Sequence, residues 1–425
     1  IIEIAESGWY EDRIFHRVIN GFMIQGGSGD GLGITGTGQK FDDEYHADLQ
    51  FTSPGLLAMA KAGDDTNDSQ FFITDIPSGG FSLPRWLDFN HTIFGMITDG
   101  DGVREAISQA QTDASDRPLD EILIESVEIF QDAQNAVMLV GAPHGTYDSG
   151  DITVTVRDGK GGTASKTIRV NVLPDSSNSN PFLGPIDPIW LAIDTPHHFQ
   201  LEATDVEGDT VYYAAELLTE TSDLEVSVDE NGLVTIVPKN GAIGVAEVVF
   251  RVGPTAASLV PSSTGTYDES KIDSQVVMIH IPPATPTIKL APGMDTGVID
   301  GSTNRDNSED KTLEFNIYGL AAASALKIHL NGVEVPHQEI SRIAQGDGSA
   351  NYVATIRLAT GSRLSDGEYI LQAQQVLPLG EAYGNQVLPS DLSAPFLFTV
   401  DTEAPPITSA PVTDAYLGEL YEYNA

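Results

Sequence analysis

Hydrophobic and polar residues alternate with a period of two along most of the chain beyond about residue 131. Residues 151–157 and 167–172 show this pattern on either side of a glycine-rich turn at 158–162. Such an arrangement predicts a β-hairpin, because successive side chains of a strand point to opposite faces. Similar runs, separated by Gly, Asn and Asp, occur at 198–203, 233–237, 246–252, 275–281, 313–317, 326–330, 352–357 and 396–400. Short strands at this spacing predict β-sandwiches of about 100 residues each.

Polar and proline-rich segments divide this part of the chain into modules. The boundaries fall in the run 174–181, at Pro282, Pro283 and Pro286, and at Pro405 and Pro406. We therefore expect a short or partial β-sandwich at 131–173, two β-sandwiches at 182–283 and 287–402, and the start of a further module at 407–425. Residues 1–130 have the dense mixture of aromatic and aliphatic residues of a compact core and are expected to form a separate domain.

The composition excludes several classes of function. Asp and Glu outnumber Lys and Arg by 62 to 21, which gives a formal net charge of −41. This charge repels phosphate backbones and anionic lipid, so we expect no nucleic-acid partner and no basic membrane anchor. The absence of cysteine excludes disulfides, cysteine-based zinc sites and thiol catalysis. No apolar run reaches the roughly 18 residues of a membrane span.

The sharpest pattern lies in the first 130 residues, where several short motifs follow one another in a fixed order. They are FHRVI at 15–19, GFMIQGG at 21–27, TG at 37–38, KFDDE at 40–44, PGLLAMA at 54–60, NDSQFFIT at 67–74, WLD at 86–88 and HTIFG at 91–95. Taken together, they resemble the cyclophilin family of peptidyl-prolyl cis-trans isomerases over residues 1–130. The resemblance implies a closed β-barrel, so the predicted fold class is all-β with a few helices, a cyclophilin-like barrel followed by tandem β-sandwiches.

The residue types in these motifs suit the isomerisation of X-Pro peptide bonds. Rotation about a peptide bond faces a barrier of about 18–20 kcal/mol, whereas the cis and trans X-Pro states lie within about 1 kcal/mol of each other. Only the barrier has to be lowered, by an apolar cup for the proline ring and a donor that favours the twisted amide. Arg17 suits the donor role, because guanidinium is permanently charged and holds its N–H groups rigidly.

The resemblance assigns roles to the individual residues. It implies that Arg17, Gln25, Phe22 and His91 are catalytic, with Gln25 orienting the arginine and the substrate carbonyl. Phe22, Met23, Phe72 and Leu87 would form the proline pocket, with His91 on its wall, and Ala60, Lys61, Gln70 and Trp86 would line the peptide groove, where the backbone of Lys61 holds the substrate. Taken alone, the apolar residues could be ordinary core and Arg17 a surface ion-pair residue. His16 is interpreted as structural, because neighbours on a strand face opposite ways.

Two features differ from the family pattern. The family has an opening strand pair and most of a helix before the segment that matches residues 7–10. This chain begins at Ile1 and stops soon after a strand-like run at 415–423. We therefore expect it to be a piece of a longer protein. A missing strand would open the barrel and expose backbone edges. The second feature is a longer loop at 76–85, just before Trp86.

No cofactor is expected. Residues 31–36 match G-x-G-x-x-G, but a second glycine loop follows them where a dinucleotide-binding motif needs a helix. Acidic groups at Asp205, Glu207 and Asp209 and within 300–310 contain oxygen ligands that suit calcium. Neither group has EF-hand spacing, so solvated acidic turns are the preferred interpretation, and no metal site is assigned.

The modules after residue 131 resemble the cadherin-like and immunoglobulin-like modules of large bacterial surface and secreted proteins. The leading hypothesis is therefore a secreted or cell-surface bacterial isomerase whose partners are proline-containing peptides or proteins of the cell envelope or matrix. The alternative is a non-catalytic adhesion or peptide-binding protein that uses the cyclophilin fold for docking.

Overall fold

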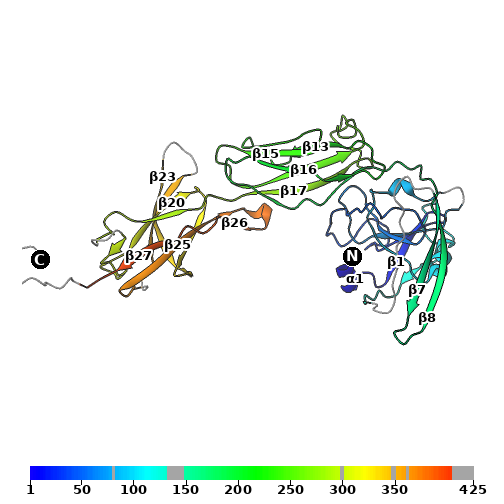
Figure 1. Cartoon of the computed structure of the whole chain (residues 1–425), viewed down its shortest axis with the longest axis horizontal. Coiled ribbons are helices and arrows are strands. Elements are labelled where there is room, and N and C mark those ends of the chain that lie inside the picture. Colours follow the sequence, from blue (N-terminus) through cyan, green and yellow to red (C-terminus); the bar gives the residue numbers. More distant parts are fainter. Residues whose placement is uncertain (79–81, 132–147, 297–300, 346–350, 360–362, 404–425) are drawn as a thin grey trace, which may run out of the picture.

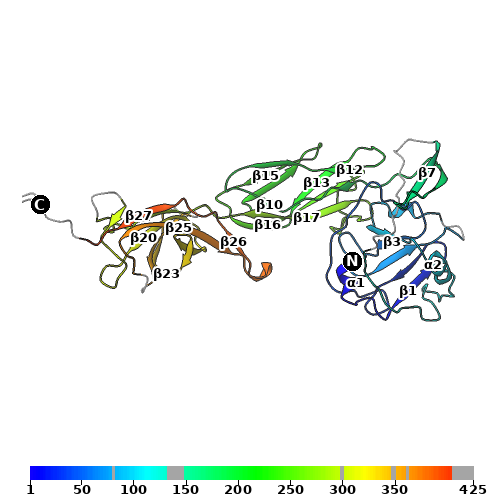
Figure 2. The same ribbon diagram turned by 60° about the horizontal axis from the view of Figure 1, so that its bottom comes forward.

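The computed structural model describes residues 1–78, 82–131, 148–296, 301–345, 351–359 and 363–403. Figures 1 and 2 show three strand-rich units that follow one another in a row, with the N-terminus in the first. The helices described are short: α1 Ile2–Glu6, α2 Asp101–Ser108, and the 3-10 turns η1 Arg85–Leu87 and η2 Glu381–Tyr383. The predicted class, mostly β with a few helices, is confirmed. The module predicted at 407–425 lies outside the described residues.

The first unit contains one antiparallel sheet in the order β5-β3-β4-β2-β1-β6. Its strands are β1 Arg13–Ile19, β2 Met23–Gly26, β3 Leu56–Met59, β4 Phe71–Thr74, β5 Ile93–Met96 and β6 Leu123–Ile124. The predicted closed barrel is not found in the described residues, where β5 and β6 are the two edges of the sheet. Closure would need β5 to pair with β6, but β6 is only two residues long and pairs with Arg13 and Ile14 of β1.

A hairpin connects the first unit to the second. Strands β7 Ser149–Arg157 and β8 Thr163–Asn171 pair along their whole length in a two-stranded sheet. This confirms the hairpin predicted around the turn at 158–162. Most side chains of both strands are exposed, and residues 132–147 lie outside the described part, so the partial sandwich predicted at 131–173 stays a prediction.

The second unit has two main sheets around one apolar core. They are β10-β17-β16-β13 and β11-β15-β14, with β9 and β12 paired beside them. The bounds are β9 Phe182–Leu183, β10 Ile189–Trp190, β11 His197–Gln200, β12 Ala203–Thr204, β13 Tyr212–Leu217, β14 Leu224–Val228, β15 Leu233–Pro238, β16 Gly244–Gly253 and β17 Asp273–Ile281. Val234 and Ile236 of β15 share the core with Val248 and Phe250 of β16. Alternate residues of each strand point inward, which is why the period-two pattern was visible in the sequence.

The third unit repeats this arrangement with sheets β18-β20-β24-β23 and β19-β27-β25-β21-β22, β26 pairing with β25. The bounds are β18 Thr287–Leu290, β19 Ser302–Thr303, β20 Glu314–Leu320, β21 Ala325–Leu330, β22 Val333–Val335, β23 His337–Ala344, β24 Tyr352–Leu358, β25 Gly367–Pro378, β26 Val387–Pro389 and β27 Phe396–Val400. Phe315 and Ile356 from one sheet meet Leu371 and Phe398 from the other. The immunoglobulin-like or cadherin-like nature of both units, and their exact boundaries, stay predictions.

Aromatic rings join the first unit to the second. Phe182 of β9 stacks on Phe89, with ring centroids 4.7 Å apart, and meets Tyr45 edge-on at 5.9 Å. Only 6% of Phe182 is exposed. Aromatic pairs in these geometries add to the free energy gained by burial. The two units are therefore packed against each other, rather than joined only by the chain.

We predict that Phe182→Ala lowers the free energy of unfolding by about 3 kcal/mol, because a buried ring is replaced by a cavity. Urea unfolding of the full chain measures the change. Phe130→Ala is the matched control: Phe130 is 77% exposed, and its loss should change stability by less than about 0.5 kcal/mol. Equal losses in the two variants would show that Phe182 does not hold the units together.

Candidate active site

Three of the predicted site residues lie in one line across the sheet of the first unit. Arg17 of β1 is opposite Gln25 of β2, and Gln25 is opposite Phe72 of β4. Directly opposed residues of antiparallel strands project from the same face. The strand register thus places the guanidinium, the amide and the aromatic ring side by side, although they are far apart in the sequence.

An apolar cluster continues this face of the sheet. Met23 and Phe72 are buried, and Phe22, Ala60 and Leu87 pack against the same cluster while remaining partly exposed. The cluster therefore has a buried floor and an accessible side. This is the combination that a proline ring needs, and a sealed core would not offer it.

Two further aromatic rings border the cluster. The Trp86 ring lies 5.7 Å from that of Phe22 and is 57% exposed, while the His91 ring meets Phe72 edge-on at 5.7 Å. Burial, followed by the charge of Lys61, lowers the pKa of His91 to about 4. Its imidazole is therefore neutral at pH 7, so His91 contributes packing and a neutral polar edge rather than a positive charge.

Hydrogen bonds fix the amides of this face. Gln25 Nε2 donates to Gln70 Oε1 at 3.1 Å, and Gln70 Nε2 donates to the carbonyl of Gly33 at 3.1 Å. Arg17 Nε lies 3.5 Å from Asp116 Oδ2, and both side chains are more than 40% exposed. Exposed ion pairs of this kind contribute only about 0–1 kcal/mol. Asp116 therefore holds the guanidinium loosely, and little is lost when Arg17 turns to another acceptor.

His16 lies beside Arg17 in β1, where the pairing with β2 is irregular, and it is buried whereas Arg17 is exposed. Only 5% of it is exposed, and burial lowers its pKa. Its ring also occupies the space beside Gly33, where a Cβ atom would come within 2.9 Å of His16 Nε2. The location supports the structural role predicted for His16.

Lys61 has a different setting from the rest of the predicted groove. Only 3% of its side chain is exposed, and its ammonium contacts Asp43 directly and Asp64 at 3.5 Å. Carboxylate oxygens of Asp43, Asp64 and Asp65 lie within 4.8 Å of one another. Such a group of oxygens could bind a cation, and here the ammonium of Lys61 is the cation that lies beside them. The side chain points into this cluster, which leaves the backbone of Lys61 for the predicted contact with substrate.

This acidic cluster was not predicted from the sequence. The available signal was the pair of Asp-Asp steps at 42–43 and 64–65 on either side of Lys61 in the chain. Asp273 was not predicted either. It is 3% exposed, accepts a hydrogen bond from the Leu183 amide, and has a pKa raised chiefly by burial. No local pattern indicated that Asp273, in the second unit, would face the first.

The structure brings together most of the predicted site. Arg17, Phe22, Met23, Gln25, Ala60, Gln70, Phe72, Trp86, Leu87 and His91 are connected by strand register, ring contacts or hydrogen bonds. Their roles stay predictions. Of the loop predicted at 76–85, residues 79–81 lie outside the described part, and Arg85 forms ion pairs with Asp88 and with Asp175.

The acidic groups interpreted as solvated turns stay a prediction, and so does the absence of a metal site among them. Asp306 is buried and pairs with Arg363 at 2.8 Å, and its carboxylate also accepts a hydrogen bond from Ser308. Asp300 lies outside the described residues. Among the helices described, none is long and apolar enough to cross a membrane.

Comparisons with known proteins identify the first unit. Residues 1–129 match the family described as cyclophilin type peptidyl-prolyl cis-trans isomerase/CLD. The human peptidyl-prolyl cis-trans isomerase-like 1 is 46% identical over 125 residues, which are 29% of this chain and 72% of the relative. Peptidyl-prolyl cis-trans isomerase A of Mycobacterium tuberculosis is 51% identical over 123 residues, covering 28% and 64%.

A third relative and a solved structure are also similar to this chain. The isomerase ppi1 of Schizosaccharomyces pombe is 48% identical over 124 residues, 28% of this chain and 76% of that protein. A solved cyclophilin-type isomerase of Cryptosporidium parvum, determined in the presence of the dipeptide Ala-Pro, is 37% identical over 31% of this chain and 82% of its own, with a TM-score of 0.28.

We predict that protonation of Asp65 stabilises the protein. Burial, with the nearby carboxylates of Asp64, Asp42 and Asp43, raises the pKa of Asp65 to about 7. In the unfolded chain an Asp ionises near pH 4. The folded state therefore binds the proton more tightly, and the stabilisation is complete below about pH 4 and is lost as the pH rises through about 7.

Asp65→Asn removes this ionisation and should make the melting temperature fall less between about pH 5 and pH 8 than in the wild type. Differential scanning calorimetry measures both curves. Asp187→Asn, in an exposed position, is the control and should follow the wild type. An Asp65→Asn curve parallel to that of the wild type would contradict the prediction.

Proposed function

Because the chain belongs to the cyclophilin-type peptidyl-prolyl cis-trans isomerase family, we propose that Arg17 stabilises the twisted amide during X-Pro isomerisation. The observation that carries this proposal is the cross-strand line of Arg17, Gln25 and Phe72. It sets a permanent donor next to the apolar cluster that receives the proline ring.

The chemistry requires no proton transfer and no covalent intermediate. When the X-Pro bond twists, the nitrogen loses conjugation with the carbonyl and regains its lone pair. A guanidinium N–H can donate to that lone pair but not to the conjugated nitrogen of either planar state. Arg17 therefore binds the transition state better than the ground states, which is the condition for a higher rate.

The apolar cluster supplies the second part of the mechanism. Phe72 and Met23 form the buried floor of the cluster, and the partly exposed Phe22 and Leu87 would surround a proline ring. Holding the ring while the preceding carbonyl rotates restricts the motion to the bond that must twist. Gln25, whose Nε2 also donates to Gln70, would donate its other amide N–H to that carbonyl.

The expected substrates are proline-containing segments of proteins outside the cytoplasm. The two units that follow the isomerase lie in a row with it (Figure 1), as spacers of a surface protein would. The high negative charge of the chain also suits an exposed, soluble array.

We predict that Arg17→Ala lowers kcat/KM for an X-Pro test peptide by about 10- to 150-fold, because one charge-assisted hydrogen bond of about 1.5–3 kcal/mol is lost in the transition state. Exchange NMR on the full chain measures the rate. Arg17→Lys keeps the positive charge but lacks the rigidly held N–H groups of guanidinium, so its kcat/KM should lie between those of the wild type and Arg17→Ala.

The matched control for this experiment is Arg169→Ala. Arg169 is an exposed arginine of the β7–β8 hairpin that pairs with Asp151. Its loss should leave isomerisation at the wild-type rate. If Arg17→Ala isomerises the peptide as fast as Arg169→Ala, Arg17 is not the donor. If Arg17→Ala still binds the peptide but no longer isomerises it, binding and catalysis are separate properties of the site.

A further inference from the structure

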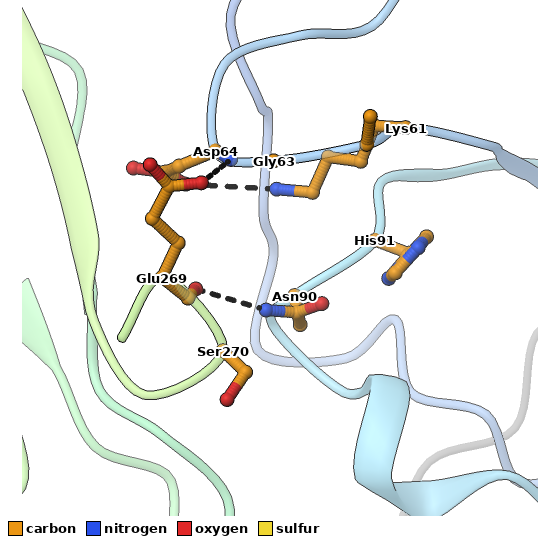
Figure 3. A pocket seen from close by; sticks show the side chains of 8 residues that line it. Lys61, Gly63, Asp64, Asn90, His91, Glu269 and Ser270 are labelled. Atoms are coloured by element: carbon orange, nitrogen blue, oxygen red, sulfur yellow. Dashed lines mark hydrogen bonds and ion pairs between the residues drawn. The ribbon is translucent and has the colours of Figure 1, made fainter. Parts of the chain in front are cut away.

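A pocket of about 140 Å³ lies where the first and second units meet (Figure 3). This is comparable to an engineered cavity of about 150 Å³ that holds a benzene molecule, so there is room for the end of one side chain. One wall is formed by residues 61–64 with Asn90 and His91, and the other by Glu269 and Ser270. His91 packs on Phe72, so the pocket adjoins the apolar cluster of the candidate active site.

The second wall comes from the loop between β16 and β17, far from the isomerase unit in the sequence. The backbone N–H of Asp64 donates to Glu269 Oε2 at 3.1 Å, and Asn90 Nδ2 donates to the Glu269 carbonyl at 3.3 Å. Gly63 makes this close approach possible, since a Cβ atom there would collide with the Glu269 carboxylate. The carboxylate is therefore seated at a defined place on the rim of the pocket.

None of the ion pairs found in the described part of the chain includes the Glu269 carboxylate. Lys61 is the basic residue that lines the pocket, and its ammonium is shared by Asp43 and Asp64. A negative charge thus faces a pocket of side-chain size beside the proline site.

The start of β17, just after this loop, is held by a second set of contacts. Asp64 Oδ2 accepts hydrogen bonds from the backbone N–H of Ser274 at 3.1 Å and from its hydroxyl at 2.6 Å. Glu269 and Ser274 therefore both bind Asp64, one through its backbone N–H and the other through its carboxylate. These contacts fix the pocket wall to the isomerase unit.

We propose that Glu269 is a specificity-determining residue that the second unit contributes to the substrate groove, favouring proline-containing substrates with a Lys or Arg side chain near the proline. The proposal rests on the proposed function of the first unit. An incoming ammonium or guanidinium would form an ion pair with the Glu269 carboxylate, whereas an acidic side chain would be repelled. Because the pocket is partly open, we expect a preference of about three- to tenfold at low ionic strength, decreasing with salt.

The test uses the full chain and peptides of equal length with one proline. A single Lys, Ala or Glu is moved through the two positions on each side of the proline. Exchange NMR gives kcat/KM, and a binding titration gives Kd for each peptide. The expected result is one position at which Lys exceeds Glu by about threefold or more in kcat/KM and in affinity.

Two variants test the assignment to Glu269. Glu269→Gln keeps an oxygen that can accept the Asp64 N–H but removes the charge, so the Lys-over-Glu ratio should fall to about one. Gly63→Ala keeps the charge but displaces the carboxylate and should also reduce the ratio. Glu230→Gln, an exposed glutamate in the same unit, should retain the wild-type ratio.

The outcomes separate this inference from the proposed function. Equal affinity and equal kcat/KM for Lys and Glu peptides at every position would overturn the role of Glu269, as would a Lys preference that survives Glu269→Gln. The role of Arg17 is judged separately, from the rate of the Ala peptides in Arg17→Ala. Affinity ratios decide the role of Glu269 even if Arg17 proves not to be the donor.

Discussion

The buried ammonium of Lys61 is the interaction on which the site and its surroundings depend. A buried charge is tolerated only when it is paired, and removing one partner of such a group is strongly destabilising. Asp43 and Asp64 provide the pairing. Asp43 also accepts hydrogen bonds from the backbone N–H of Asp65 and from the side chain of Asn67. The segment from Lys61 to Asn67, which directly follows the groove residue Ala60, is thereby held in one conformation.

The same cluster connects the isomerase unit to its neighbour. Asp64 contacts Lys61 on one side and Ser274 of the second unit on the other. Phe182 lies between Tyr45 and Phe89 at the same junction. Polar and apolar contacts therefore act together, and the second unit has a fixed place beside the groove. The second unit lies outside the residues that match the isomerase family, but it forms part of the surroundings of the site.

The strand register is the second constraint. Arg17, Gln25 and Phe72 come from three strands, and their alignment requires each strand to pair without slipping, since a shift of one residue would turn every side chain to the other face. Burial of Val18 and Ile24 on the opposite face opposes such a shift. The reactive face is thus positioned by the apolar residues behind it. The open edges at β5 and β6 do not disturb this line, because it crosses the middle of the sheet.

Much of this protein could be predicted from the sequence alone. The alternation around 158–162 determines a hairpin and the motifs from 15 to 95 determine the family, because both depend on residues close together in the chain. The acidic surroundings of Lys61 and the approach of Glu269 to Asp64 were not predictable. Residues 64 and 269 are separated by 205 positions, and no local sequence pattern indicates that they are in contact. Local preference determined the elements and the identity of the reactive residues, whereas burial and pairing of charges between distant segments decided what surrounds them.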